Sequence, residues 1–165
     1  MHPNKKIIES DIPIWLEAAE KKYPTVIGLI YLLAFFPEYR NLFYYRIGPL
    51  KYILNIFCRK LQALDIDTKD IGEGFFINHG YSTVIGAKSI GKYCRVSQQV
   101  TIGEHMDERP TIKDNVSILP GAVIVGGITI GSNSLIGANS TVFKDIPDNC
   151  TVFPPQPLVM KWKRE

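Results

Sequence analysis

Aliphatic β-branched residues recur at every sixth position through the second half of the chain. These positions are Ile112, Ile118, Ile124, Ile130, Ile136 and Val142. A helix or a flat strand does not keep one face buried under a six-residue rule, whereas a chain that turns a corner every six residues does. The pattern therefore predicts a β-helix built from hexapeptide repeats, with these side chains stacked in its interior.

The same spacing continues towards the N-terminus with two interruptions. Val84, Ile90, Val96 and Ile102 keep the six-residue step, and Ile71 and Ile77 begin it. The step from Ile77 to Val84 is seven, and the step from Ile102 to Ile112 is ten, so extra residues protrude within 78–81 and 103–111. Loops that interrupt a rigid scaffold commonly carry function. Two of the three histidines, His79 and His105, lie in these interruptions.

The segment before the repeats has helical patterning. Helices are expected over 11–22, after Ser10 or Asp11 as the N-cap, and over 25–36, 38–47 and 50–61. The apolar stretch 25–36 is shorter than the roughly 20 residues of a membrane span, so it indicates a buried helix. We expect a mainly β fold: a left-handed parallel β-helix over 64–153, an N-terminal α-helical cap over 1–63, and a C-terminal tail over 154–165.

Composition narrows the class of protein. The 165 residues are 45 % hydrophobic and 21 % charged, which is typical of a globular chain. A net charge of +3 without an arginine-rich stripe argues against nucleic-acid binding. Cys58, Cys94 and Cys150 are too widely spaced for a zinc site, and as an odd number they do not indicate a disulfide framework. We expect reduced thiols and, since no signal peptide is visible, a cytoplasmic protein.

Several segments resemble one known family. They are residues 71–80, 100–103, 136–140 and 144–149 of the repeats, together with 36–48 of the cap. The chain resembles the hexapeptide-repeat acyltransferases, and within them the serine acetyltransferase-like branch that includes polysaccharide O-acetyltransferases of the colanic acid type. The resemblance implies acetyl transfer from acetyl-CoA to a hydroxyl or amine, without a metal.

The resemblance also implies a catalytic group. His79 occupies the position of the family's general base, and an imidazole with a pKa near 6.5 can take the proton of an attacking alcohol. A backbone N–H facing the acetyl-CoA groove is expected to stabilise the oxyanion. An upstream aspartate orients the imidazole in the family, and Asp65 is the nearest match, although Asp67 competes for that role.

The acceptor is less directly indicated. Asn78 stands where serine enzymes carry an aspartate, Ala87 stands where a glutamate is expected, and Glu108-Arg109 replaces an Arg-His pair. A buried ammonium without a charged partner is costly, so these departures favour a sugar or polysaccharide-precursor hydroxyl. Its expected contacts are Asn78, Tyr81, Gln99, His105 and Arg109. Serine O-acetyltransferase and a catalytically silent β-helix scaffold remain as alternatives.

Acetyl-CoA is expected along a groove between neighbouring coils. The matching positions are Gly103, Pro120, Gly121, Gly137, Ala138 and Lys144. Glycine and alanine allow a pantetheine arm to approach the backbone, and a lysine can meet a phosphate. Because the flanks of one coil need covering, we expect a homotrimer, with the cap available to join two trimers into a hexamer. The two interrupting loops would then meet across a subunit boundary.

The cap also suggests a location. Residues 39–63 contain five basic residues and no acidic one, interleaved with aromatic residues. Such a composition is typical of a helix face that rests on anionic lipid, which predicts peripheral contact with the inner face of the membrane. The alternative is that the aromatic residues pack in the core of the cap and the basic groups are simply solvated.

Overall fold

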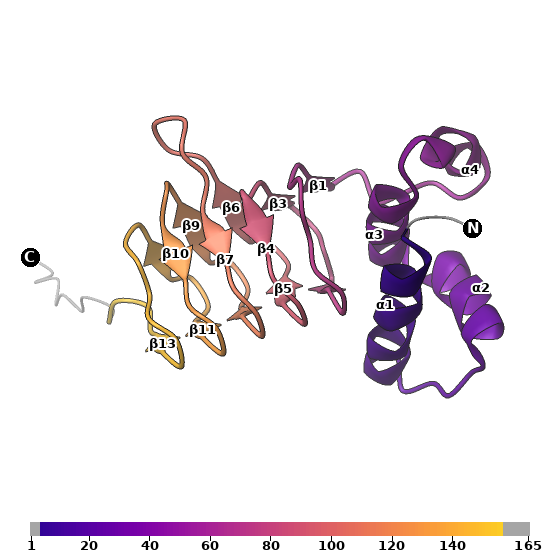
Figure 1. The fold of residues 1–165 in the computed structure, drawn as a ribbon, viewed down its shortest axis with the longest axis horizontal. Helices are drawn as coiled ribbons and strands as arrows, with labels where there is room; N and C mark the ends of the chain where they lie inside the picture. Colours follow the sequence, from indigo (N-terminus) through magenta and orange to yellow (C-terminus); the bar gives the residue numbers. More distant parts are fainter. Residues whose placement is uncertain (1–3, 157–165) are drawn as a thin grey trace, which may run out of the picture.

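The computed structural model describes residues 4–156. Its strands form three parallel sheets, which are the three faces of a single coil. The strands are β1 (Leu64–Ile66), β2 (Phe76–Asn78), β3 (Thr83–Ile85), β4 (Ser89–Ile90), β5 (Arg95–Ser97), β6 (Thr101–Gly103), β7 (Thr111–Ile112), β8 (Ser117–Ile118), β9 (Val123–Val125), β10 (Thr129–Ile130), β11 (Leu135–Ile136), β12 (Thr141–Val142) and β13 (Thr151–Val152). Successive strands fall in different sheets, so the chain turns a corner after each (Figure 1).

Strand order defines the three faces of the coil. Sheet A has the order β1-β3-β6-β9-β12, sheet B has β10-β7-β4, and sheet C has β13-β11-β8-β5-β2. Every neighbouring pair is parallel. The predicted parallel β-helix is confirmed, and its interior is the predicted stack of aliphatic residues. Ile112, Ile118, Ile124, Ile130, Ile136 and Val142 are each at most 3 % exposed.

The inward-facing register differs from the prediction at β3. Val84 is 41 % exposed, whereas Ile85 is fully buried and pairs with Ile102. Because Thr83, Val84 and Ile85 are all β-branched, the sequence alone fits either register. Pairing with β1 selects the one that buries Ile85, since Ile66 lies opposite it. The loop after β2 is therefore longer than predicted, and the next corner is shorter.

Within residues 4–156, four α-helices form the cap, which lies at the end of the long axis opposite β13 (Figure 1). They are α1 (Lys5–Ala18), α2 (Thr25–Phe35), α3 (Pro37–Ile47) and α4 (Lys51–Phe57), with a short 3-10 turn (Gly48–Leu50) before α4. The prediction that the first helix starts after Ser10 or Asp11 is wrong, because Asp11 lies inside α1 and is buried. The predicted fourth helix is also too long, since α4 ends at Phe57.

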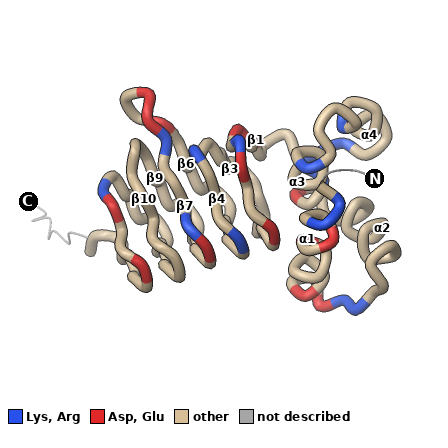
Figure 2. Tube along the Cα trace, in the orientation of Figure 1, with Lys and Arg blue, Asp and Glu red and all other residues tan. Residues whose placement is uncertain are grey.

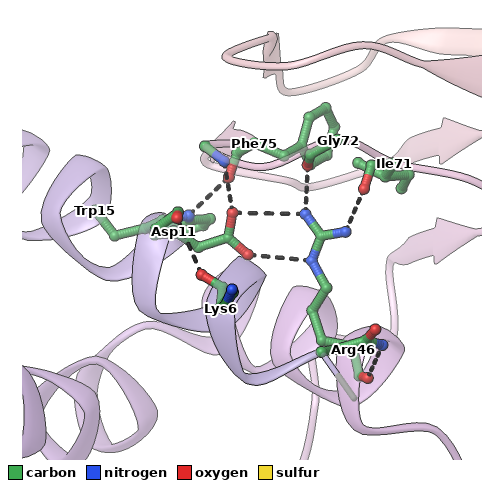
Figure 3. A network of polar contacts seen from close by, with 10 residues as sticks. Lys6, Asp11, Trp15, Arg46, Ile71, Gly72 and Phe75 are labelled. Carbon is green, nitrogen blue, oxygen red and sulfur yellow. Dashed lines mark hydrogen bonds and ion pairs between the residues drawn. The ribbon is translucent and has the colours of Figure 1, made fainter.

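The cap and the first coil share one hydrophobic core. Trp15 of α1 stacks edge-on against Phe76 of β2 with ring centroids 4.8 Å apart, and its Nε1 donates to the Phe75 carbonyl at 2.9 Å. Arg46 of α3 donates to the carbonyls of Ile71 and Gly72 (Figure 3). α1 and α3 therefore rest on the coil, while α2 and α4 lie on their far side (Figure 1).

Two further sequence expectations concern the ends and the membrane. Residues 157–165, which include the basic end of the expected tail, lie outside the described residues. Within residues 4–156, no single helix meets the length and hydropathy needed to cross a membrane. Thr25–Phe35 and Pro37–Phe57 meet those requirements only as a pair, and they are bent by 116° where they join.

Candidate functional site

One edge of the coil carries His79 and most of the residues expected to touch acetyl-CoA. This edge, called the His79 edge below, comprises the corners between sheets C and A, at residues 79–82, 98–100, 119–122 and 137–140. Backbone hydrogen bonds stack them: Gln99 donates to Tyr81, Gly121 to Gln98, and Asn139 to Pro120. The structure thus aligns His79, Tyr81, Gln99, Pro120, Gly121, Gly137 and Ala138 on successive coils.

His79 stands at the start of this edge in an unusual backbone conformation. Its φ is 61°, in the left-handed region, and its side chain is exposed directly after β2. Gly80 follows with φ +24°, and a Cβ there would lie 2.9 Å from Glu38 Cγ and 3.1 Å from Leu64 Cδ2. Only glycine leaves room for α3 at this point. The turn is therefore held close against the cap while the imidazole remains accessible to solvent.

A second edge carries the remaining candidates. This loop edge comprises the corners between sheets A and B, at residues 67–70, 86–88, 104–110, 126–128 and 143–145. His105, Arg109 and Lys144 belong to it, and Gly103 ends β6 beside it. The strands of sheet A separate the two edges, so one subunit does not bring these four residues to His79.

The long loop 103–111 is an ordered hairpin that projects from the coil (Figure 1). His105 and Glu108 exchange backbone hydrogen bonds of 3.0 and 3.2 Å, and Met106 and Asp107 form the tip with positive φ. Figure 2 shows charges of both signs along this loop.

Arg109 fastens the hairpin to the first coil. Its Nη1 and Nη2 donate to the carbonyl and carboxylate of Asp67 at 2.8 and 2.9 Å, and its Nε donates to Glu104 at 3.2 Å. These hydrogen bonds raise the pKa of Arg109. A groove of about 680 Å³ lies beside this contact, lined by both partners together with Lys69, Lys88 and Glu108. The guanidinium predicted to bind substrate is thus engaged in holding the loop.

The candidate carboxylates occupy different places around His79. Asp67 is excluded as its orienting partner within one subunit, because it lies on the loop edge and accepts from Arg109. Asp65 lies in β1 opposite the outward-facing Val84, is exposed, and makes no hydrogen bond to His79 among the described residues. Its orienting role remains a prediction. Sequence reasoning missed a third carboxylate, Glu38, which α3 buries against Gly80.

Metal ligation finds no support in the described part of the chain. Residues 4–156 contain no group of three His, Cys, Asp or Glu side chains arranged to hold an ion. Cys94 is buried, and burial raises the pKa of its thiol to about 11, whereas Cys58 is exposed.

Comparisons with known proteins agree with this geometry. Residues 109–144 match the bacterial transferase hexapeptide family (six repeats). Serine acetyltransferase from Synechococcus elongatus is 38 % identical over 117 residues, covering 67 % of this chain and 48 % of the relative. The Bacillus subtilis serine acetyltransferase is 47 % identical over 87 residues, covering 50 % of this chain and 40 % of the relative. The chain therefore spans less than half the length of these two relatives.

Solved structures extend the similarity across the cap. Serine acetyltransferase isoform 3 from Entamoeba histolytica, in complex with cysteine, superposes with a TM-score of 0.71 at 29 % identity, covering 96 % of this chain and 61 % of that one. The Neisseria gonorrhoeae serine acetyltransferase in complex with serine gives 0.67 at 27 % identity, covering 92 % and 68 %.

These comparisons correct the expected acceptor. Relatives at 38 % and 47 % identity and the structural neighbours are serine acetyltransferases, so the expectation of a sugar or polysaccharide hydroxyl, and of a colanic acid type enzyme, is wrong. It rested on neutral or altered residues at 78, 87 and 109, which do not outweigh similarity over the whole fold. The chain is thus similar to serine acetyltransferases in both sequence and fold, and its residues 109–144 match the bacterial transferase hexapeptide model.

Proposed function

We propose that the chain transfers the acetyl group of acetyl-CoA to the hydroxyl of serine. The observation that carries this proposal is His79, an exposed imidazole at the first corner of an edge lined by small residues. It belongs to a fold similar over nearly its whole length to serine acetyltransferases. Because the chain is shorter than those proteins, its activity has to be measured directly.

His79 is the proposed general base. Its imidazole takes the serine hydroxyl proton as the oxygen attacks the thioester carbonyl, and the carbon–sulfur bond then breaks. The imidazolium returns that proton to the departing CoA thiolate, so the reaction yields O-acetylserine and CoA with His79 unchanged. General-base catalysis of this kind contributes about 10² to 10⁴ in rate.

Acetyl-CoA is proposed to lie along the His79 edge. Gly121 and Ala138 are small and half-buried there, which suits the narrow pantetheine arm, whereas Gly137 is buried against Val152. Backbone N–H groups of these corners are suitable donors for the oxyanion that forms during attack. Lys144, exposed on the loop edge, is suited to a CoA phosphate supplied by a neighbouring subunit.

The proposed assembly is a homotrimer, and the separation of the two edges supports it. Rotation about a threefold axis can place the loop edge of one subunit against the His79 edge of the next, which would unite His79 with His105 and Lys144. Light scattering at micromolar concentration is expected to give three times the chain mass. A monomer that is fully active would contradict this arrangement.

The test of the proposed function is a thiol-release assay. Purified protein and acetyl-CoA are mixed with L-serine, with D-serine, or without acceptor, and O-acetylserine is identified by mass spectrometry. We expect CoA release that depends on L-serine and exceeds hydrolysis without acceptor. Release that is independent of L-serine under all these conditions would refute the proposal.

We further propose that the chain is cytoplasmic and touches the inner face of the membrane through the α4 surface, residues 50–60. Here Tyr52, Ile56 and Phe57 are 72, 73 and 80 % exposed. Exposed Lys51, Arg59 and Lys60 flank them in sequence, and the segment has no acidic residue. Exposed apolar side chains together with basic ones complement an anionic lipid surface.

A further inference from the structure

Glu38 is a largely buried residue whose carboxylate has no partner among residues 4–156. It is the second residue of α3, its side chain is only 8 % exposed, and it makes no hydrogen bond or ion pair to any described residue. The other charged residues buried in residues 4–156 are Asp11 and Arg46, and they pair with each other. Glu38 is therefore exceptional among the buried charges of this part of the chain.

The Glu38 carboxylate keeps a limited contact with water. It makes no hydrogen bond, yet its oxygens are not among the side-chain atoms of residues 4–156 that are sealed from solvent without a partner. A carboxylate in such a recess is accessible to a small cation and is screened by less water than one on an open surface. The position is therefore suited to binding a ligand.

The location of Glu38 indicates which ligand. Its Cγ lies 2.9 Å from the point that a Cβ of Gly80 would occupy, so the side chain packs on the turn that carries His79. In serine the hydroxyl and the ammonium are on adjacent carbons. An acceptor whose hydroxyl reaches His79 therefore carries its ammonium into the immediate neighbourhood of this turn.

Other groups at the turn are less suited to a cation. Asn78 is neutral, and Asp65 is exposed on the outer face of sheet A. The attraction of a solvated carboxylate for a cation is weakened by water, whereas that of a buried one is much stronger. Glu38 combines negative charge, burial and proximity to the turn.

We propose that Glu38 forms the subsite for the ammonium group of an amino-acid acceptor. This inference rests on the proposed transfer to serine and names the residue that selects an amino acid over other hydroxyl compounds. The cap thus takes part in acceptor recognition, because α3 supplies a charged group to a turn of the coil.

The experiment compares Glu38→Gln with the matched control Glu17→Gln, which makes the same chemical change at an exposed position of α1. The acceptors are L-serine and 3-hydroxypropionate, which lacks only the ammonium. Glu38→Gln is expected to lower the kcat/KM ratio of serine to 3-hydroxypropionate at least about tenfold, through KM of serine, because a hydrogen bond to a charged group is lost. The control is expected to keep the wild-type ratio.

Thermal melting and calorimetric binding separate the possible failures. A melting temperature of Glu38→Gln equal to or above that of wild type supports a binding role. An unchanged selectivity ratio, or a lowered melting temperature with equal losses for both acceptors, overturns it. If wild type does not turn over serine, only the proposed function fails. The subsite is then tested by calorimetry, where equal binding of serine to wild type and Glu38→Gln overturns it.

Discussion

Asp11 and Arg46 form an ion pair that is almost sealed from solvent, with 3.1 Å between Asp11 Oδ2 and Arg46 Nε and side chains 2 and 3 % exposed. The pair joins α1 to α3, and both partners also reach the coil. Asp11 accepts from the Gly74 N–H at 2.8 Å, and Arg46 donates to two carbonyls of the same turn (Figure 3). Burial raises the pKa of Asp11 against the opposing attraction of Arg46. The pair therefore fixes the position of the cap, and of Glu38 on α3, relative to the His79 turn.

Replacing Arg46 by Met is expected to destabilise the protein by about 3–5 kcal/mol, because it leaves Asp11 charged, buried and unpaired. Urea unfolding measures this change. Lys92→Met is the matched control, since it breaks the solvent-accessible pair of Lys92 with Glu73 and should cost much less. Equal effects of the two substitutions would show that the buried pair does not anchor the cap.

Replacing His79 by Gln is expected to lower acetyl transfer to serine at least about 10²-fold while leaving a folded oligomer. The side chain is exposed, so its loss removes no core packing. Stopped assays with acetyl-CoA and serine measure the rate, and circular dichroism checks the fold. His105→Gln, on the loop edge, is the matched control and should cost less. Near wild-type turnover by the His79 variant would remove this imidazole from the mechanism.

Some positions of the coil require glycine, whereas others tolerate replacement of glycine by alanine. A Cβ on Gly91 would lie 2.7 Å from the backbone nitrogen of Asp114 in the next coil, whereas a Cβ on Gly103 has Thr101 Cγ2 at 3.9 Å as its nearest neighbour. We expect Gly91→Ala to destabilise the coil by about 1–3 kcal/mol through overpacking. Gly103→Ala should leave the melting temperature within about a degree of wild type. The reverse order of melting temperatures would contradict the coil spacing.

Burial of Cys94 makes stability depend on alkaline pH. Its thiol pKa is raised to about 11, so the folded state keeps the proton above pH 9 while the unfolded chain releases it. The free energy of unfolding should therefore fall as pH rises from about 9 to 11, by about 2 kcal/mol from this group. Comparing urea unfolding of wild type and Cys94→Ala isolates the effect, because other groups titrate in both. Parallel pH profiles would show that Cys94 is accessible to water.

The regular part of the coil could be predicted because its constraint is local and repeated. The six-residue spacing alone predicts the burial of the aliphatic residues from Ile112 to Val142. The interruption at 103–111 is visible as a break in that spacing. The register at Val84 and Ile85 could not be read this way, since both residues suit a strand interior. Only the pairing of β1 with β3 distinguishes them.

The site was predicted less completely, because its parts come together through contacts across the chain. His79 follows from the break in spacing, but Glu38 reaches Gly80 only through the packing of α3 on the coil. Likewise the sequence offers Asp67 as a partner for His79, whereas its contact with Arg109, 42 residues away, holds it at the other edge. The sequence places Arg46 among the five basic residues of 39–63, whereas the structure buries it with Asp11.

The last prediction concerns the α4 surface. Of the aromatic residues expected at lipid, Tyr44 is buried in the cap, so the packing alternative holds for it, whereas Tyr52 and Phe57 are exposed. The protein should float with vesicles containing anionic lipid at low salt, and less with neutral vesicles or at high salt, because its basic groups are screened. Replacing Lys51, Arg59 and Lys60 by Gln should abolish flotation, and replacing Ile56 and Phe57 by Ser should do the same through loss of apolar contact.

Replacing Lys21 and Lys22 by Gln is the control for a loss of positive charge, because both lysines are exposed elsewhere on the cap. This variant should still bind the vesicles. If the wild type stays in the soluble fraction with every vesicle, the α4 surface does not bind lipid, and burial against a second copy of the cap becomes the explanation to test.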